Sequence, residues 1–208
     1  MDNYYYFNDD RIVNLDIEEN IRQILFKHSQ SLNTLADRIY DKKVVFDEGT
    51  TLPIINLYSG EDTNKARLFE KGDLIDYFSY GLFMFISEKL KSIFDHFHVE
   101  AFYSPAKITL DEANIFDNYY LFCPKIAINA INYQTSIFSV ESNNDSTVSK
   151  IEKLILDSNT IPSDIHMFIL ANTYQNIRVI SEKLADTLIS NHISGFSVRK
   201  IEDGSWLW

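Results

Sequence analysis

Apolar residues recur at helical spacing in two short segments of the chain. In the first segment they stand at i, i+3, i+4 and i+7, the stripe that an amphipathic helix buries: Leu90, Ile93, Phe94 and Phe97. Leu184 and Leu188 occupy the same stripe in the second segment. The pattern therefore predicts two amphipathic helices in which Leu90, Phe94, Leu184 and Leu188 are buried.

The two segments belong to an internal repeat. Residues 86–90 recur letter for letter as residues 180–184, an offset of 94. The same register without gaps aligns residues 80–102 with residues 174–196 and makes 8 of 23 positions identical, so we treat the segments as two copies. Ser87 and Ser181 stand where a helix N-cap belongs, because a serine oxygen can accept a hydrogen bond from a first-turn amide.

Each copy is predicted to run strand, helix, strand. The outgoing strands are residues 83–86 and 177–180, and the returning strands are residues 99–103 and 193–198. Aromatic and β-branched runs predict further strands at residues 4–7, 44–46, 52–58, 107–110, 119–122 and 151–156. A helix capped by Asp16 is predicted over residues 17–28, and polar loops over residues 142–146 and 159–164.

These elements predict an α+β fold with mixed sheets and two repeated strand–helix–strand units. An N-terminal α/β segment, residues 1–72, precedes a domain of residues 73–208 that holds the copies at 73–110 and 164–201. The chain has 208 residues, of which 45% are hydrophobic, and this suffices for a packed interior. We therefore expect the two parts to form one globular unit.

Charge limits the classes of partner. The chain has 19 Lys and Arg against 30 Asp and Glu, a formal net charge of -11 at pH 7. A general nucleic-acid binder needs cations to displace phosphate counterions, so nucleic acid is not an expected partner. The acidity instead favours a partner with a basic face, or serves solubility alone.

The sequence indicates a cytoplasmic protein. The most apolar run, residues 78–86, is far shorter than the roughly 20 residues that a membrane helix needs, so a membrane is not an expected partner either. The N-terminus shows no secretory signal. Cys123 is the one cysteine and cannot form an internal disulfide, which fits a reducing compartment.

Motifs of catalysis and of cofactor binding are missing from the sequence. It holds no nucleophile elbow, phosphate-binding glycine loop or HExxH helix, so we expect no catalytic residue, no cofactor and no metal. Cys123 could be a nucleophile, but a buried thiol at the end of a strand is favoured. His96 and His98 could share a metal ion only if His98 has left the helix. The repeat pairs His98 with His192 at a helix C-terminus, where the macrodipole favours a cation.

Two groups of residues are candidate contacts for a partner protein. Acids in turns project into solvent, where they form either an ordinary solvated surface or a contact for a basic partner. The first choice among them lies in the acid-rich N-terminal third: Asp47, Glu48, Glu61 and Asp62. Trp206 and Trp208 end the chain, and they either dock on the core or anchor a partner, because tryptophan is enriched at interface hot spots.

The two copies resemble the immunity proteins of bacterial polymorphic-toxin systems, specifically immunity family eleven. The resemblance covers about Asp73 to Ile201, and the letters that carry it are residues 180–184, residues 193–196, Tyr119-Tyr120-Leu121 and Phe168. The first copy departs from the pattern at Ala101, where the second has Gly195. The N-terminal 70 residues carry no matching letters.

The resemblance implies a cytoplasmic toxin inhibitor, encoded beside a toxin that neighbouring cells deliver by contact-dependent or type VI secretion. Such a protein binds its toxin tightly and blocks the active site or the entry of substrate, with no cofactor and no catalysis. Many toxin domains are basic nucleases, so an acidic inhibitor would associate faster. Two rival functions stay open: a small enzyme that uses Cys123 or the His96/His98 pair, and an adaptor module of secretion machinery.

Overall fold

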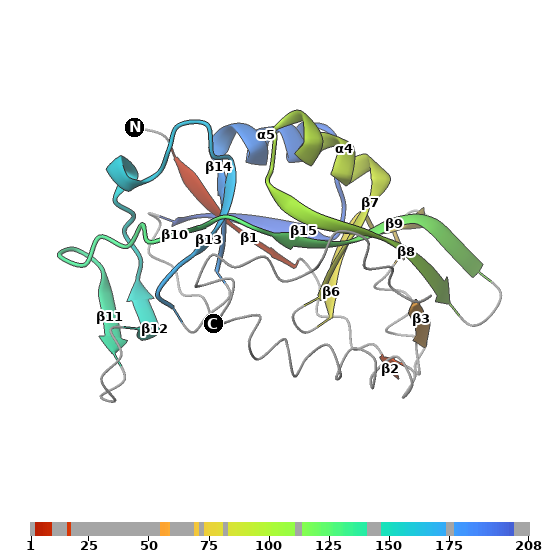
Figure 1. Cartoon of the computed structure of the whole chain (residues 1–208), viewed down its shortest axis with the longest axis horizontal. Coiled ribbons are helices and arrows are strands. Elements are labelled where there is room, and N and C mark those ends of the chain that lie inside the picture. Colours follow the sequence, from red (N-terminus) through yellow and green to blue (C-terminus); the bar gives the residue numbers. More distant parts are fainter. Residues whose placement is uncertain are drawn as a thin grey trace.

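The computed structural model shows an α+β fold with mixed sheets, and the two helices among the described residues lie on one side of the strands (Figure 1). The structure describes residues 3–9, 16–17, 55–58, 69–70, 73–80, 83–110, 114–140, 147–173 and 177–201.

A five-stranded sheet contains the N-terminal strand. The order of its strands is β10 (Ala127–Ile128), β13 (Met167–Leu170), β14 (Arg178–Ser181), β1 (Tyr4–Asp9) and β15 (Phe196–Lys200). β10 and β13 are parallel, and every other neighbouring pair is antiparallel. β1 lies between β14 and β15, so residues from the two ends of the chain share one ladder.

A six-stranded sheet forms the other half of the fold. The order of its strands is β2 (Asp16–Ile17), β3 (Ile55–Tyr58), β8 (Ala101–Leu110), β9 (Asn114–Pro124), β7 (Phe83–Ser87) and β6 (Tyr77–Tyr80). Only β3 and β8 are parallel among these described pairs. Two further pairs are β4 (Phe69–Glu70) with β5 (Asp73–Leu74) and β11 (Ile137–Val140) with β12 (Val148–Lys153), and a 3-10 turn spans Ser158–Thr160.

Each helix connects two parallel strands that have a third strand between them. α4 (Glu88–His96) joins β7 to β8, and both of these strands run antiparallel to β9, which separates them. α5 (Glu182–Ser190) joins β14 to β15, and both run antiparallel to β1. The two crossovers therefore have the same arrangement, with the helix packed on the sheet that its own strands help to form.

The two helices begin in the same way. The hydroxyl oxygen of Ser87 accepts the amide N–H of Leu90 at 3.2 Å, and that of Ser181 accepts the amide N–H of Leu184 at 3.3 Å. Both serines have extended backbone and act as the N-caps that the sequence predicted. A glutamate follows each cap, where a negative charge is favoured by the helix dipole.

The two helices also end in the same way, at a left-handed residue: His98 with φ 51° and His192 with φ 52°. After α4, the amide of Val99 donates to the carbonyl of Phe94 at 2.9 Å, and α5 is followed by the corresponding bond at 3.1 Å. This is the Schellman ending, in which glycine is the usual left-handed residue and histidine is one of the few others that tolerate it. His98 has therefore left the helix.

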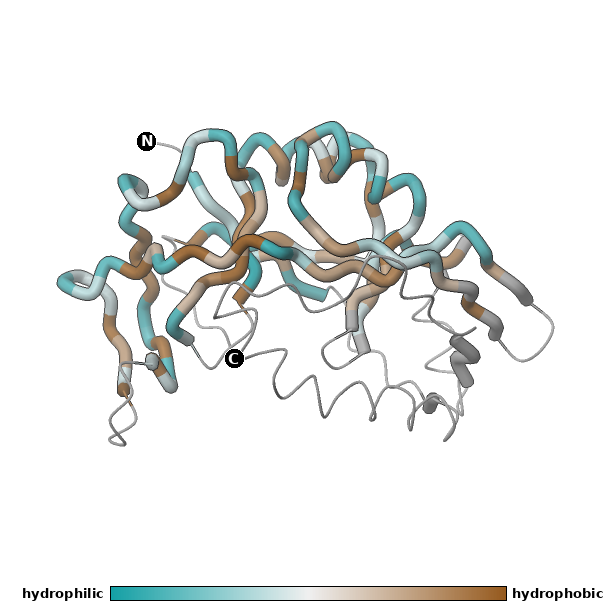
Figure 2. The backbone as a smooth tube through the Cα atoms, in the orientation of Figure 1, coloured by the Kyte–Doolittle hydropathy of each residue, from teal (hydrophilic) through white to brown (hydrophobic). Residues whose placement is uncertain are grey.

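The main hydrophobic core lies between the helices and the two sheets. Leu90, Phe94, Leu184 and Leu188 are each 0% exposed, which confirms the predicted stripes. They pack in one cluster with residues of both sheets, including Phe7 and Phe122. A second core contains Val179, whereas Ile180 belongs to the first, so the two cores cover opposite faces of β14. Figure 2 shows that apolar residues dominate the central strands, whereas apolar and polar residues alternate along the helices.

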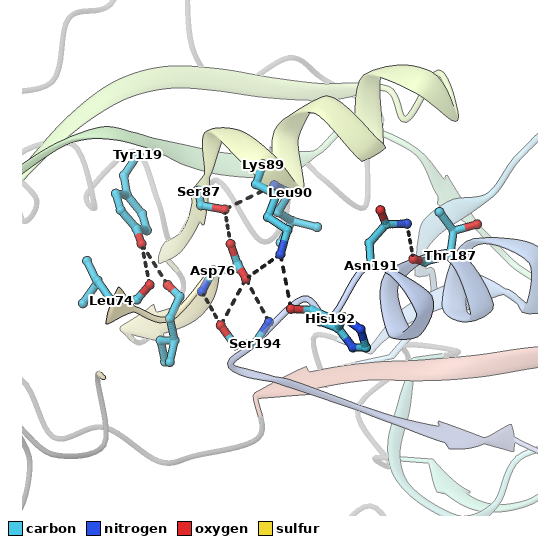
Figure 3. A network of polar contacts seen from close by, with 11 residues as sticks. Leu74, Asp76, Ser87, Lys89, Leu90, Tyr119, Thr187, Asn191, His192 and Ser194 are labelled. Atoms are coloured by element: carbon cyan, nitrogen blue, oxygen red, sulfur yellow. Dashed lines mark hydrogen bonds and ion pairs between the residues drawn. The ribbon is translucent and has the colours of Figure 1, made fainter. Parts of the chain in front are cut away.

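One carboxylate ties the start of α4 to the turn that follows α5 (Figure 3). Asp76 Oδ1 accepts the hydroxyl of Ser87 at 2.6 Å. Asp76 Oδ2 accepts both the amide of Ser194 at 3.0 Å and its hydroxyl at 3.1 Å. The amide of Asp76 donates back to the Ser194 hydroxyl oxygen at 3.0 Å. Lys89 Nζ lies 3.9 Å from Asp76 Oδ2 and donates to the carbonyl of His192.

Gly195 allows this close approach. Its φ is +88°, in the left-handed region, and a Cβ at this position would lie 1.9 Å from the carbonyl oxygen of Tyr77. The amide of Tyr77 also donates to the carbonyl of Ser194 at 3.1 Å. Only glycine satisfies both the backbone conformation and the contact.

Most of the predicted elements that fall in the described ranges are present as predicted. The strands at residues 4–7, 83–86, 107–110, 119–122 and 177–180 are confirmed, the returning strands are β8 and β15, and residues 52–58 contain β3. Residues 159–164 hold the end of the 3-10 turn and the turn after it. The strand at 44–46 and the loop at 142–146 lie outside the described residues. The boundary near residue 72 stays a prediction.

Three expectations were wrong. Ile17 belongs to β2, so the helix predicted over 17–28 does not begin there, and the rest of that helix lies outside the described residues. The strand predicted at 151–156 is β12, which is shifted toward the N-terminus and ends at Lys153. The gapless register fails at the hairpins: Tyr77 pairs with Ile86, but Met167 pairs with Ile180. Equivalent residues in the first strands of the two hairpins, such as Tyr77 and Met167, are thus 90 residues apart instead of 94. The reason is that the second hairpin is longer.

No helix within the described ranges is long and apolar enough to cross a membrane.

The buried stripes predict how the helices respond to truncation. Phe94→Ala and Leu188→Ala should each lower the free energy of unfolding by about 2–5 kcal/mol, because both side chains are fully buried and leave cavities. Ile189→Ala is the matched control, since Ile189 is the next residue of α5 and is 54% exposed. Urea unfolding followed by circular dichroism measures the effect. Equal loss for Leu188→Ala and Ile189→Ala would show that the helix faces are misassigned.

Candidate functional site

The partner contacts expected from the sequence all lie outside the described ranges: Asp47, Glu48, Glu61, Asp62, Trp206 and Trp208. Their role stays a prediction. The described residues instead offer a surface on the hairpin of β11 and β12, whose first strand the sequence analysis does not predict. The signal for β11 is a short uncharged run, Ile-Phe-Ser-Val at 137–140, between two polar stretches.

One strand of this hairpin is anchored in the core. Val148 and Ile151 of β12 are buried and belong to the second core. They are three residues apart, an odd spacing that still allows both to face inward because the pairing of β11 with β12 shifts register between them. The hydroxyl of Ser149 donates to the carbonyl of Ser139 at 3.1 Å and holds the two strands together. The hairpin projects from the body of the fold, at the lower left of Figure 1.

The other strand is exposed and apolar. Four large hydrophobic side chains are exposed in the described part of the chain, and three of them lie on or beside β11: Tyr133 at 43%, Ile137 at 54% and Val140 at 48%. The ring of Tyr133 meets that of Phe138 edge-on at 5.6 Å, so the turn before β11 packs against the strand. Apolar exposure concentrated in one short segment is a feature of interaction surfaces.

β11 is also an edge strand. Within the described residues it pairs with β12 alone, which leaves a row of backbone N–H and C=O groups along its outer side. Natural edge strands are usually protected by charge or proline, and residues 137–140 contain neither. An extended segment of another protein could add to such an edge through main-chain hydrogen bonds.

A cavity of about 480 Å³ opens beside the base of the hairpin. Its lining is mixed, with Ile155 and Leu156 as apolar walls and Asn132, Lys153 and Asp157 as polar groups. The polar side chains belong to the turn before β11, to the last residue of β12 and to the segment after it, so the cavity lies at the base of the hairpin. Its volume lies within the range of about 300–1,000 Å³ that drug-sized ligands occupy, so it has room for side chains of a partner.

A serine–histidine pair is present, and its geometry is that of a helix cap. His166 Nδ1 lies 2.9 Å from Ser181 Oγ, which also accepts the amide of Leu184. Burial, followed by the charge of Lys183, lowers the pKa of His166. The same place beside the cap of α4 is taken by Asp76, which bonds the hydroxyl of Ser87. The pair therefore fixes the start of α5, and the serine oxygen is engaged by the backbone.

Cys123 is unsuited to act as a nucleophile in this structure. It lies near the end of β9, and burial raises the pKa of its thiol to about 11, which the charges of Arg178 and Lys125 only partly offset. A thiol with this pKa is almost wholly protonated at neutral pH, and the thiolate is the reactive form. The buried-thiol interpretation is the one that this environment supports.

Metal ligands do not gather in the part of the chain that the structure describes. No group of three or more His, Cys, Asp and Glu side chains there could hold a metal ion. His96 ends α4 and packs edge-on against Phe97, while His98 is the left-handed residue beyond the helix. The two histidines thus have distinct places at the C-terminus of the helix.

The described residues thus include an apolar strand edge on β11. Comparison with known families gives the class: the Immunity protein family (Imm11) matches residues 13–203. The match spans most of the chain, which therefore belongs to this immunity protein family, as the two copies indicated. No curated protein matches the chain.

Proposed function

We propose that this protein binds and neutralises a cognate toxin, by blocking the active site of the toxin or the entry of its substrate. The observation that carries the proposal is the family match over residues 13–203. The protein would act in the cytoplasm, against a toxin delivered by contact-dependent or type VI secretion. Inhibition by binding requires no cofactor and no catalytic step from this chain.

We also propose that the two strand–helix–strand units are copies of one repeat. Their serine caps, left-handed histidines and crossover arrangements agree in detail. The carbonyl of Asp76 accepts the amide of Ser87 at 2.8 Å, and the carbonyl of His166 accepts the amide of Ser181 at 2.9 Å, so each strand leads into its helix with the same contact. Identical local geometry at identical letters supports a common origin.

Two surfaces are proposed to meet the toxin. The turn acids Asp47, Glu48, Glu61 and Asp62 would face a basic surface of the toxin and speed association, since opposite charges steer diffusional encounter. The edge of β11 would pair with an extended strand of the toxin, and Ile137 and Val140 would supply the apolar contacts. Trp206 and Trp208 are an alternative aromatic anchor.

The function is tested with the toxin domain encoded beside this gene. The full chain should co-purify with that domain and protect cells that express it, because a neutralising partner must bind before the toxin acts. Size-exclusion chromatography and survival of co-expressing cells measure the two outcomes. Binding without protection, or protection without binding, would contradict inhibition by capture. The neighbouring toxin domain of a different strain is the specificity control.

The acidic surface predicts a salt-dependent association rate. The rate constant should fall as salt rises from 0.1 M to 1 M, because the Debye length shrinks from about 10 Å to about 3 Å. Changing Asp47, Glu48, Glu61 and Asp62 together to Asn or Gln should slow association and flatten the salt dependence. Stopped-flow mixing measures both. If the association rate constant does not change with salt in either the parent or this variant, the acidic residues do not steer the toxin and serve solubility alone.

The strand edge predicts a different kinetic effect. Ile137→Ser with Val140→Ser should weaken toxin binding at least about tenfold, mainly through faster dissociation, because the lost contacts are apolar and central. Ile189→Ser is the matched control, since Ile189 is also 54% exposed but lies on α5. Biolayer interferometry separates the two rate constants. If both changes have the same small effect, the β11 edge does not contact the toxin.

A further inference from the structure

The N-terminal strand occupies a particular place in the second unit. The first unit orders its strands β6-β7-β9-β8, and the second orders its strands β13-β14-β1-β15. In the first unit β9 runs antiparallel to β7 and β8 and separates them, and α4 connects these two strands. In the second unit β1 runs antiparallel to β14 and β15 and separates them, and α5 connects these two strands. β1 therefore stands in the second unit where β9 stands in the first, although β1 begins the chain and β9 directly follows β8.

The strand registers make this correspondence residue by residue. Ser87, the cap of α4, pairs with Tyr119 of β9, and Ser181, the cap of α5, pairs with Tyr4 of β1. Because both pairings start from equivalent caps, Tyr4 corresponds to Tyr119, and each later residue of β1 corresponds to the residue 115 positions further along the chain.

The amino acids agree with this correspondence, which was obtained from pairing alone. The six letters at positions 2–7 are Asp-Asn-Tyr-Tyr-Tyr-Phe, and those at positions 117–122 are Asp-Asn-Tyr-Tyr-Leu-Phe. Five of the six are identical at the offset of 115 that the registers dictate. The internal repeat found in the helices has an offset of 94, so this second likeness is a separate observation.

The equivalent side chains also have equivalent surroundings. Tyr4, Tyr6 and Phe7 are buried and Tyr5 is half-buried, and the residues from Tyr119 to Phe122 follow the same order of burial. Phe7 and Phe122 both contact Phe94 of the shared core, at ring-centroid distances of 6.3 Å and 5.0 Å. A chance likeness of letters would not reproduce this order of faces, because a shift of one residue exchanges the two faces of a strand.

The ends of the strands are placed as a broken hairpin would place them. In the first unit β8 leads directly into β9, with Leu110 paired to Asn114 across the connection. In the second unit β15 ends at Lys200, which pairs with Tyr5 beside the start of β1. The end of β15 therefore lies next to the start of β1, where a hairpin connection would join them.

The pairing also locates the one-residue difference between the units. Tyr103 lies opposite Phe122, and Val198 lies opposite Phe7, so the returning strands correspond at an offset of 95. The extra residue falls at Ser194-Gly195, the turn that carries the contacts to Asp76. The second unit thus has one residue more than the first at the place where the two units meet.

We propose that the chain is a circularly permuted duplication, in which β1 is the final strand of the second repeat and is encoded at the start of the chain. The proposal extends the repeat described above and is independent of the toxin. It makes the slot between β14 and β15 a binding site for a strand of the type Asp-Asn-Tyr-Tyr-x-Phe, which this chain fills with its own N-terminus. The family match begins at residue 13, after this strand.

The test is a permutant that restores the unpermuted order, residues 10–208 followed directly by residues 1–9. No linker is added, because residues 201–208 and 1–3 connect β15 to β1. Its midpoint of thermal unfolding should lie within about 5 °C of the parent. Phe7→Ala should lower the midpoint equally in both chains, since Phe7 would occupy the same slot. An unchanged midpoint for Phe7→Ala in the permutant would overturn the proposal.

A second permutant separates a bad junction from a wrong assignment. It has the same junction between residues 208 and 1 but is opened within residues 141–146. Folding of this control without folding of the first permutant would overturn the proposal. If both fail, the exchange variant Tyr6→Leu with Leu121→Tyr decides, because it has the natural termini and gives each strand the six letters of the other. A midpoint within about 5 °C of the parent supports the equivalence, and an unfolded chain overturns it.

Discussion

The carboxylate of Asp76 is the polar group that joins the two strand–helix–strand units beside their shared core. Its side chain is 14% exposed and it accepts hydrogen bonds from both Ser87 and Ser194, so the cap of α4 and the turn after α5 are held by one group. Loss of either partner would leave a largely buried charge short of hydrogen bonds, which costs far more than an exposed pair contributes. His166 does the equivalent task for the cap of α5 alone, and the structure is asymmetric at this point.

The sequence patterns predicted the two helices well, because helix formation here depends on residues that are close together in the sequence. The stripe of Leu184 and Leu188 and the cap at Ser181 each depend on residues within one or two turns. Strand partners depend on the whole chain, so the place of β1 could not be predicted from residues 4–9 alone. A signal did exist in the likeness between residues 2–7 and 117–122. It is easily overlooked, because its offset differs from that of the helices.

The candidate site was harder to predict than the fold. Net charge gave a sign for the partner but could not show which acids lie together, since that depends on tertiary structure. The letters of Ile137 and Val140 do not distinguish a buried strand from an exposed one, because many apolar residues of folded proteins reach the surface. Cys123 was easier to predict: the thiol follows Phe122 near the end of an apolar strand and is half-buried, and desolvation raises its pKa.

The position of β1 has a consequence for how the protein is made. Tyr4 to Asp9 are synthesised well before their partners, which are residues 178–181 and 196–200. At about 5–20 residues per second, roughly 10–40 s pass before β14 and β15 exist. Throughout this time the aromatic side chains of β1 have no slot to enter, so the nascent chain is exposed to aggregation or to a chaperone at this strand. Completion of the five-stranded sheet therefore waits for the synthesis of β15.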